Sequence, residues 1–304
     1  MSQKKHIVAA TDFSQHSAEA VERGFMIASQ WSARYTILHA VELDALSPFQ
    51  ALFVENPDLG EKLAAVERNR LHEFICALPH PEGVHAELRV ESGPASVAIP
   101  GFLSSAGGDL LVIGAHGGGF FDRLVPGSTA SALLRESREP VLIVRNKPRE
   151  PYRRVLVAVD FSPASESAVA LARDIAPEAS LTLIHIFDAP FEGMLRLAGV
   201  DDWKIASYEM EAKRQAGQKL ESLMRGQGLT PAQCSTVVIQ GDPTRQLLRY
   251  EENLGCDLII VGKHGTHLSE ELLLGSKTNH LLAMSRRDLL VVVDPRGPAA
   301  PEGI

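Results

Sequence analysis

Two glycine-rich stretches with one internal spacing, G-x2-G-x9-G-S, lie in the two halves of this 304-residue chain. The first copy comprises Gly114, Gly117, Gly127 and Ser128, and the second, 148 residues later (262 − 114), comprises Gly262, Gly265, Gly275 and Ser276. Glycine lets the backbone turn sharply and approach an anion closely. The free amides and the dipole at the start of a following helix attract phosphate. The repeated spacing therefore predicts two phosphate-binding loops.

Polar side chains accompany both loops. Ser128 and Thr129 open the helix expected after the first loop, and Ser276 and Lys277 open the helix after the second, where Lys277 adds a positive charge. His116 and His264 occupy the same place inside each loop. Each of these histidines could donate a hydrogen bond to a phosphate, and simple loop filling is an equal alternative.

An aspartate follows the first apolar run of each half, at Asp12 and at Asp160, again 148 residues apart (160 − 12). A carboxylate in this place can accept hydrogen bonds from a ribose hydroxyl or an adenine amine, as an acidic residue does in dinucleotide-binding folds. The alternative is that each aspartate caps a helix and the glycines serve tight turns. Because spacing and context recur in both halves, we favour the ligand site.

Short β-rich runs alternate with helical patterns along each half. In the first half we expect strands near 6–11, 35–40, 84–91, 109–114 and 140–145, with helices near 15–31, 59–78, 95–106 and 128–138. In the second half we expect strands near 154–159, 181–186, 235–240, 257–262 and 288–293. Ser14 and Ser162 are candidate N-caps for the helices after the first strands. The alternation predicts a doubly wound parallel sheet with helices on both faces.

The fold class we expect is therefore α/β: two tandem doubly wound domains, each a five-stranded parallel sheet of order 3-2-1-4-5. Residues 1–147 would form the first domain, 153–295 the second and 296–304 a flexible tail. Ligands bind such sheets at the carboxyl ends of the strands where the winding reverses, here between strands 1 and 4. Asp12 and Gly114 close those two strands, so the aspartate and the loop should face one crevice.

These motifs resemble the universal stress protein family, whose ATP-binding members carry G-x2-G-x9-G-[S/T] and an aspartate after the first strand. The resemblance covers roughly 4–145 and 153–293. It implies binding of ATP, or of AMP or ADP, with Mg²⁺ as a candidate companion, and a role in the stress response. It also implies that adenine is recognised by backbone after strand 2, at Ala40 and Ile186. Domains of the family pair through their last strands, which implies a pseudo-dimer within this chain, and a homodimer is a further option.

The two copies are not equivalent in sequence. The first loop is unusually rich in glycine, whereas the second places Glu270 and Glu271 near the expected phosphate, partly offset by Lys263. Equal affinity at the two sites is therefore not expected. A separate apolar segment, 187–203, could cover a pocket or contact a partner, although packing back on its own domain is the favoured reading.

Composition excludes several classes of function. A net charge of -8 argues against a general nucleic-acid binder. No signal peptide and no apolar run of about 20 residues is found, so no membrane association is expected. The three cysteines, Cys76, Cys234 and Cys256, show no metal-site spacing and suit a reducing cytoplasm. No metal site is expected.

Enzymatic signatures are also missing. The chain contains no Walker A motif, and no base or arginine finger can be named for attack on a γ-phosphate. We therefore predict no catalytic residues and a regulatory nucleotide-binding module. The alternatives are a slow ATPase, or an interaction scaffold in which one or both nucleotide sites are degenerate.

Overall fold

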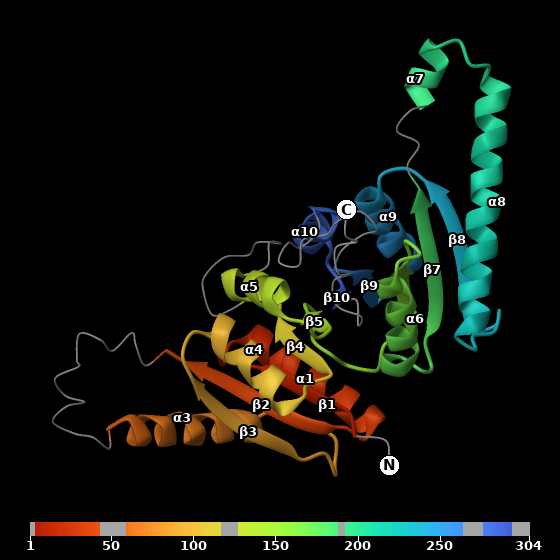
Figure 1. Cartoon of the computed structure of the whole chain (residues 1–304). Coiled ribbons are helices and arrows are strands. Elements are labelled where there is room, and N and C mark those ends of the chain that lie inside the picture. The colour runs from red at the N-terminus through yellow and green to blue at the C-terminus, as the bar shows by residue number, and fades with distance from the viewer. Residues whose placement is uncertain (1–3, 43–58, 117–126, 188–191, 264–275, 294–304) are drawn as a thin grey trace. The chain divides into compact units, whose positions relative to one another are not determined.

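The computed structural model describes residues 4–42, 59–116, 127–187, 192–263 and 276–293 (Figure 1). The chain divides into two compact units, Met1–Pro151 and Tyr152–Ile304. Each unit is described by itself. The expected tail 296–304 lies outside the described residues, and the pairing of the two halves through their last strands stays a prediction.

The first unit is a five-stranded parallel sheet of order β3-β2-β1-β4-β5. Its strands are β1 (His6–Ala10), β2 (Arg34–Val41), β3 (Ala86–Ser92), β4 (Leu110–Gly114) and β5 (Val141–Val144). Its helices are α1 (Gln15–Trp31), α3 (Leu59–Cys76), α4 (Ala95–Ala106) and α5 (Ser128–Glu136).

The second unit repeats this order as β8-β7-β6-β9-β10, again with parallel neighbours. Its strands are β6 (Arg154–Ala158), β7 (Ser180–Phe187), β8 (Cys234–Gln240), β9 (Leu258–Gly262) and β10 (Asp288–Val292). Its helices are α6 (Pro163–Ile175), α7 (Glu192–Leu197), α8 (Asp202–Gly226), α9 (Pro243–Leu254) and α10 (Ser276–Met284). The predicted fold class is confirmed in both halves.

Burial of the central strands explains their near-continuous apolar sequence. Leu110, Leu111 and Val112 in β4 are fully buried, as are Leu258, Ile259 and Ile260 in β9. Right-handed crossovers place helices on both faces of such a sheet. In the first unit α1 packs on β1, β4 and β5, while α4 packs with α5 and against β2 (Figure 1). A strand covered on both sides has no polar face to alternate with.

Ser14 and Ser162 both occupy N-cap positions, but only Ser14 caps with its side chain. Ser14 Oγ accepts from the amide of Ser17 at 3.2 Å. The hydroxyl of Ser162 makes no side-chain cap bond and donates instead to Asp160 Oδ1 at 2.5 Å. The predicted capping chemistry is therefore correct for α1 and wrong for α6, where the Ser162 hydroxyl is directed to the Asp160 carboxylate.

Two of the three cysteines are buried. Burial raises the pKa of the Cys234 thiol to about 11 and that of Cys256 to about 12, so both stay protonated at neutral pH. In the described part of the chain, every helix is too short or too polar to cross a bilayer.

Gly24 in α1 packs closely against Tyr35 of β2, and this contact can be tested by substitution. The buried phenol of Tyr35 donates to the carbonyl of Val21 in α1 at 2.8 Å. A Cβ added at Gly24 would lie 2.4 Å from the Tyr35 oxygen. Gly24→Ala should therefore lower the free energy of unfolding by about 1–3 kcal/mol through overpacking, despite the better helix propensity of alanine.

Gly217 in the middle of α8 provides the matched control, because a Cβ there meets nothing within 4 Å. Gly217→Ala should stabilise its unit by roughly 0.4–1 kcal/mol. Urea denaturation followed by far-UV circular dichroism measures both changes. A Gly24→Ala protein as stable as the wild type would contradict the packing described for α1 and β2.

Candidate functional site

The carboxyl ends of β1 and β4 form the centre of the candidate site in the first unit. β1 lies between β2 and β4 in the sheet, and Ala9 is in register with Val112. Asp12 comes two residues after the end of β1, and Gly114 is the last residue of β4. The sheet order therefore brings the predicted aspartate and the start of the predicted loop to the same edge. β6 and β9 bring Asp160 and Gly262 to one edge in the second unit.

Gly114 is required by packing of the backbone. A Cβ added there would lie 2.7 Å from the carbonyl carbon of His16 and 2.8 Å from its oxygen, at the start of α1. These are backbone atoms, so they cannot rotate away. The structural role given as the alternative for the glycines therefore applies at this position, and Gly114 holds α1 close to the end of β4.

The ladder between β1 and β2 ends at the point where adenine recognition is expected. The last rung is the bond from the amide of Thr11 to the carbonyl of Leu38, at 2.9 Å. A further parallel rung would join the amide of Ala40 to the Thr11 carbonyl and the amide of Phe13 to the Ala40 carbonyl. Instead, the Thr11 carbonyl accepts from His39 Nδ1 at 2.8 Å, and the Phe13 amide donates to Thr11 Oγ1 at 3.0 Å.

The backbone of Ala40 therefore lies beyond the last rung of the β1–β2 ladder, on the side of β2 that faces β1. In a strand the amide and carbonyl of one residue point to the same side, and neighbouring residues alternate. The carbonyl of Leu38 points to β1, whereas that of Val41 accepts from Gly93 on the β3 side at 2.9 Å. Ala40 thus presents both backbone groups on the β1 side. One donor beside one acceptor can pair with the edge of a purine.

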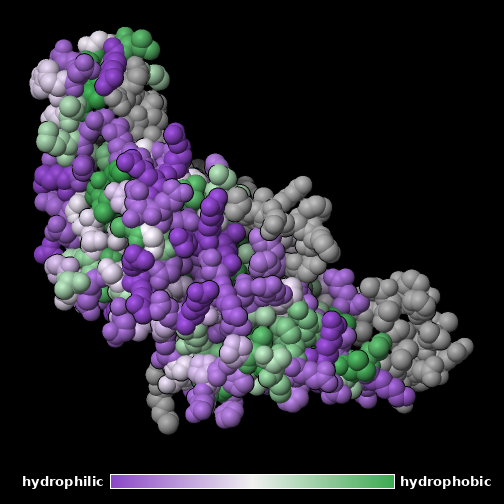
Figure 2. Space-filling model, turned by 180° about the vertical axis from the view of Figure 1, so that it is seen from behind, coloured by the Kyte–Doolittle hydropathy of each residue, from purple (hydrophilic) through white to green (hydrophobic). Residues whose placement is uncertain are grey.

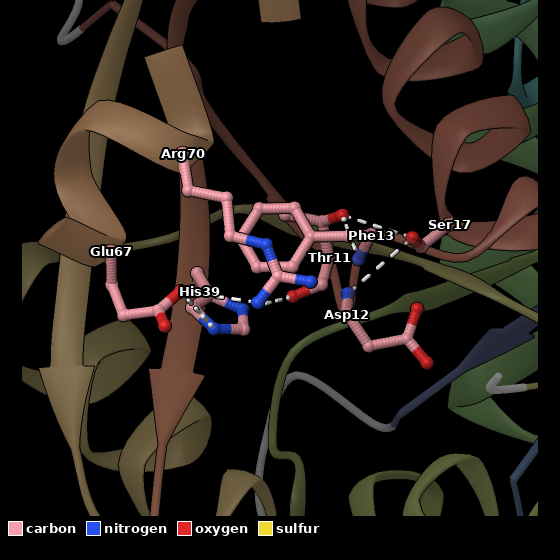
Figure 3. A network of polar contacts seen from close by, with 7 residues as sticks. All are labelled: Thr11, Asp12, Phe13, Ser17, His39, Glu67 and Arg70. Carbon is pink, nitrogen blue, oxygen red and sulfur yellow. Dashed lines mark hydrogen bonds and ion pairs between the residues drawn. The ribbon is translucent and has the colours of Figure 1, made fainter. Parts of the chain in front are cut away.

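A turn at Phe13 takes the chain out of the sheet. Its φ of 64° lies in the left-handed region, which costs a residue other than glycine roughly 1–2 kcal/mol. Its ring lies 4.3 Å from the ring of His39 and 4.2 Å from the guanidinium carbon of Arg70. Figure 3 shows Arg70 over the Phe13 ring and Glu67 beside His39. These contacts pack the strained turn at Phe13 against His39 of β2 and Arg70 of α3.

His39 lies between the Thr11 carbonyl and the carboxylate of Glu67. Because a carbonyl can only accept, His39 Nδ1 carries the hydrogen in its bond to Thr11. His39 Nε2 lies 3.8 Å from Glu67 Oε2, and Arg70 Nη1 lies 3.5 Å from the same oxygen. His39 is thus a half-buried histidine whose Nδ1 is hydrogen-bonded within the protein.

The second unit repeats this arrangement with different side chains. Phe161 has a φ of 62°, and its ring lies 4.4 Å from that of His185. His185 Nδ1 donates to the carbonyl of Val159 at 2.7 Å. Lys219 of α8 takes the place of Arg70, with its ammonium 5.5 Å from the Phe161 ring. The backbone of Ile186 therefore corresponds to that of Ala40.

The phosphate end of the first site is formed by the start of α5. Gly127 is the N-cap of α5, its amide donates to the Ala115 carbonyl at 3.1 Å, and it gives the helix no side-chain cap. Ser128 and Thr129 are exposed in the first turn, where helix amides have no partner within the helix. The ring of His116 lies 5.3 Å from that of His16 in α1. Gly117 lies outside the described residues.

Less of the second phosphate end is described. Gly262 ends β9, and its carbonyl accepts from Thr278 Oγ1 in the first turn of α10 at 3.2 Å. Lys263 is only 3% exposed, so its charge is withdrawn from solvent. Ser276 and Lys277 begin α10. Four of the expected features, His264, Gly265, Gly275 and the pair Glu270 and Glu271, lie outside the described residues.

Several residues at the site were not identified from the sequence, namely Phe13, Phe161, His16, Arg70 and Lys219. The recurrence of Asp-Phe-Ser in both halves was a signal for the two phenylalanines, because an aromatic residue that recurs beside the site aspartate indicates a role at the site. Arg70, Lys219 and His16 have no such signal, since their approach to the site depends on helix packing. Among the described residues no cluster of three or more metal-ligating side chains occurs.

Three described apolar side chains of the segment 187–203 are exposed. Met194, Leu197 and Trp203 are 64%, 90% and 68% exposed. Figure 2 shows hydrophobic atoms at the surface around α7, at the top of that view. The favoured reading of this segment is therefore wrong for these three side chains, although α7 itself contacts α8 of the same unit.

Comparison with known proteins places this architecture in a family. The model of the universal stress protein family matches residues 4–145 and 151–293. The chain is similar to the universal stress protein Rv2005c of Mycobacterium tuberculosis, with 27% identity over 300 residues that cover 95% of this chain and 97% of that protein. It is also similar to Rv2623 of the same species, with 28% identity over 286 residues that cover 87% and 91%.

A solved structure shows the same fold. The crystal structure of a universal stress protein from Archaeoglobus fulgidus superimposes with a TM-score of 0.64 at 19% identity, over 96% of this chain and 99% of that one. Two matches to one family model, one in each half, account for nearly the whole chain. The chain is thus a tandem, two-domain member of the universal stress protein family.

Proposed function

We propose that this protein binds adenine nucleotides, ATP first among them, at the carboxyl edge of each sheet and acts as a regulatory module in the stress response. The observation that carries the proposal is the end of the β1–β2 ladder. There the Thr11 carbonyl accepts from His39, and the Phe13 amide donates to the Thr11 hydroxyl. The backbone of Ala40 is therefore left facing the expected ligand position. A ligand that offers a complementary donor and acceptor, as adenine does, can replace that rung.

The remaining parts of a mononucleotide have partners along the same edge. Asp12 lies between the adenine position and the end of β4, where a carboxylate suits a ribose hydroxyl or an adenine amine. The uncapped start of α5, with the exposed hydroxyls of Ser128 and Thr129, suits phosphate. In this proposal Asp160, Ile186, Gly262 and the start of α10 have the corresponding roles in the second unit.

The proposal assigns no catalytic step to these residues. The groups placed beside the expected phosphates are hydroxyls, backbone amides and the imidazoles of His16 and His116. If Mg²⁺ accompanies the nucleotide, phosphate oxygens and water supply most of its ligands.

The first test is direct binding. Purified protein should bind ATP in isothermal titration calorimetry, more tightly than it binds GTP, because adenine presents an acceptor at N1 and a donor at N6, and guanine reverses donor and acceptor at these two positions. Turnover of ATP should stay far below the ordinary enzyme range of about 1–10³ s⁻¹. Hydrolysis within that range would contradict the binding-module assignment, and equal affinity for GTP would contradict the adenine assignment.

The phosphate end is tested by adding bulk at the third glycine of each motif. Gly127→Val together with Gly275→Val should reduce ATP binding by about a hundredfold or more, because a branched side chain occupies the position expected for phosphate and costs several kcal/mol of binding. Far-UV circular dichroism should remain that of the wild type. ATP affinity that is unchanged in the folded double variant would show that the loops do not hold phosphate.

The adenine end is tested at His39. His39→Leu leaves the Thr11 carbonyl available to the Ala40 amide, so the ladder can extend and compete with the ligand. ATP affinity of the first site, measured in a protein with Gly275→Val, should fall about fivefold or more, the equivalent of about one hydrogen bond. His85→Leu makes the same chemical change on an exposed side chain just before β3, at the opposite end of the sheet, and should have no effect. A loss of affinity equal in both variants would contradict the role given to His39.

A further inference from the structure

The two site aspartates differ in how their carboxylates are bonded. Asp160 Oδ1 accepts three hydrogen bonds, from the Ser162 amide at 3.0 Å, the Ser162 hydroxyl at 2.5 Å and the Ser165 hydroxyl at 2.6 Å. A carboxylate oxygen has two lone pairs, so three donors leave it no capacity for another. Asp160 is half-buried. One of its two oxygens is therefore committed to the protein.

The serine that corresponds to Ser165 is bonded differently in the first unit. Ser17 Oγ lies 2.9 Å from Thr11 Oγ1 and donates to the Ser14 carbonyl at 3.0 Å. A hydroxyl has one proton, so that of Ser17 is used within this group and not on the neighbouring carboxylate. Asp12 is exposed, and its Oδ1 accepts from the Ser14 amide at 3.0 Å.

One residue accounts for this difference. Thr11 precedes Asp12, and its hydroxyl pairs with Ser17. The residue before Asp160 is Val159, which is 3% exposed and has no hydroxyl. Both serines accept from the amide of their own aspartate, at 3.3 Å in the first unit and 3.0 Å in the second. Without a threonine beside it, Ser165 donates to the carboxylate.

We propose that the residue before the aspartate, Thr11 in one unit and Val159 in the other, determines whether the serine hydroxyl of the following helix donates to that aspartate, and that the bond from Ser165 to Asp160 lowers the nucleotide affinity of the second site. The proposal rests on the nucleotide-binding function proposed above. A ribose hydroxyl or adenine amine that approaches Asp160 Oδ1 must displace a charge-assisted bond from a serine. At Asp12 the corresponding serine hydroxyl is already held by Thr11 and Ser14.

The test compares matched serine variants, with one site titrated at a time. Gly275→Val leaves the first site for titration with ATP, and Gly127→Val leaves the second. Ser165→Ala, which removes one donor from Asp160, should tighten the second site about threefold or more. Ser17→Ala removes the equivalent hydroxyl from the first unit and should change ATP affinity by less than about twofold.

The reciprocal exchange guards against a folding defect in any one variant. Val159→Thr should tighten the second site, and Thr11→Val should weaken the first, each with an unchanged circular dichroism spectrum. A folded Ser165→Ala protein whose second site is unchanged or weaker would overturn the inference alone. A lower ATP affinity of the second site in Ser165→Ala would mean that the serines orient the Asp160 carboxylate for the ligand. Absence of ATP binding at both sites would overturn the proposed function and this inference with it.

Discussion

The hydrogen bond from the histidine of the second strand to the carbonyl that follows the first strand organises both halves of this protein. His39 holds Thr11 in this way, and His185 holds Val159. The ladder between the two strands ends at this carbonyl. The chain then leaves the sheet through a phenylalanine in the left-handed region. The two strands stop pairing at this point, at the carboxyl edge where the ligand is expected.

The strained phenylalanine and the histidine stabilise one another. A left-handed residue with a Cβ persists only where its surroundings over-determine its conformation. The rings of Phe13 and Phe161 contact a histidine on one side and a cation on the other, from Arg70 or Lys219. The cation belongs in each case to the helix that precedes the edge strand. Docking of that helix and formation of the crevice are therefore linked through a single aromatic ring.

Duplication preserved this frame but not the side chains around it. Both units keep the aspartate, the phenylalanine and the histidine, whereas Thr11 is replaced by Val159, Arg70 by Lys219 and His16 by Ala164. Each replacement changes a neighbour of the expected ligand rather than the backbone. Loss of the Thr11 hydroxyl redirects a serine to Asp160, and the buried Lys263 stands where the first unit has Ala115. Two copies of one fold can thus differ in affinity without differing in architecture.

The sequence by itself determined the fold class, the duplication and most element boundaries. Uninterrupted apolar runs, and polar and glycine residues that recur at the same spacing in both halves, leave few alternatives to two doubly wound sheets. Helices α1 and α4 begin and end at the expected residues. The tertiary structure decided what the motif residues do. Gly114 is needed for the contact with α1, Ser162 donates to Asp160, and Ala40 points to the expected ligand position. These roles depend on how the elements pack in the folded chain. Periodicity reports which face of an element is buried, but hydrogen-bond partners are chosen only when the elements meet.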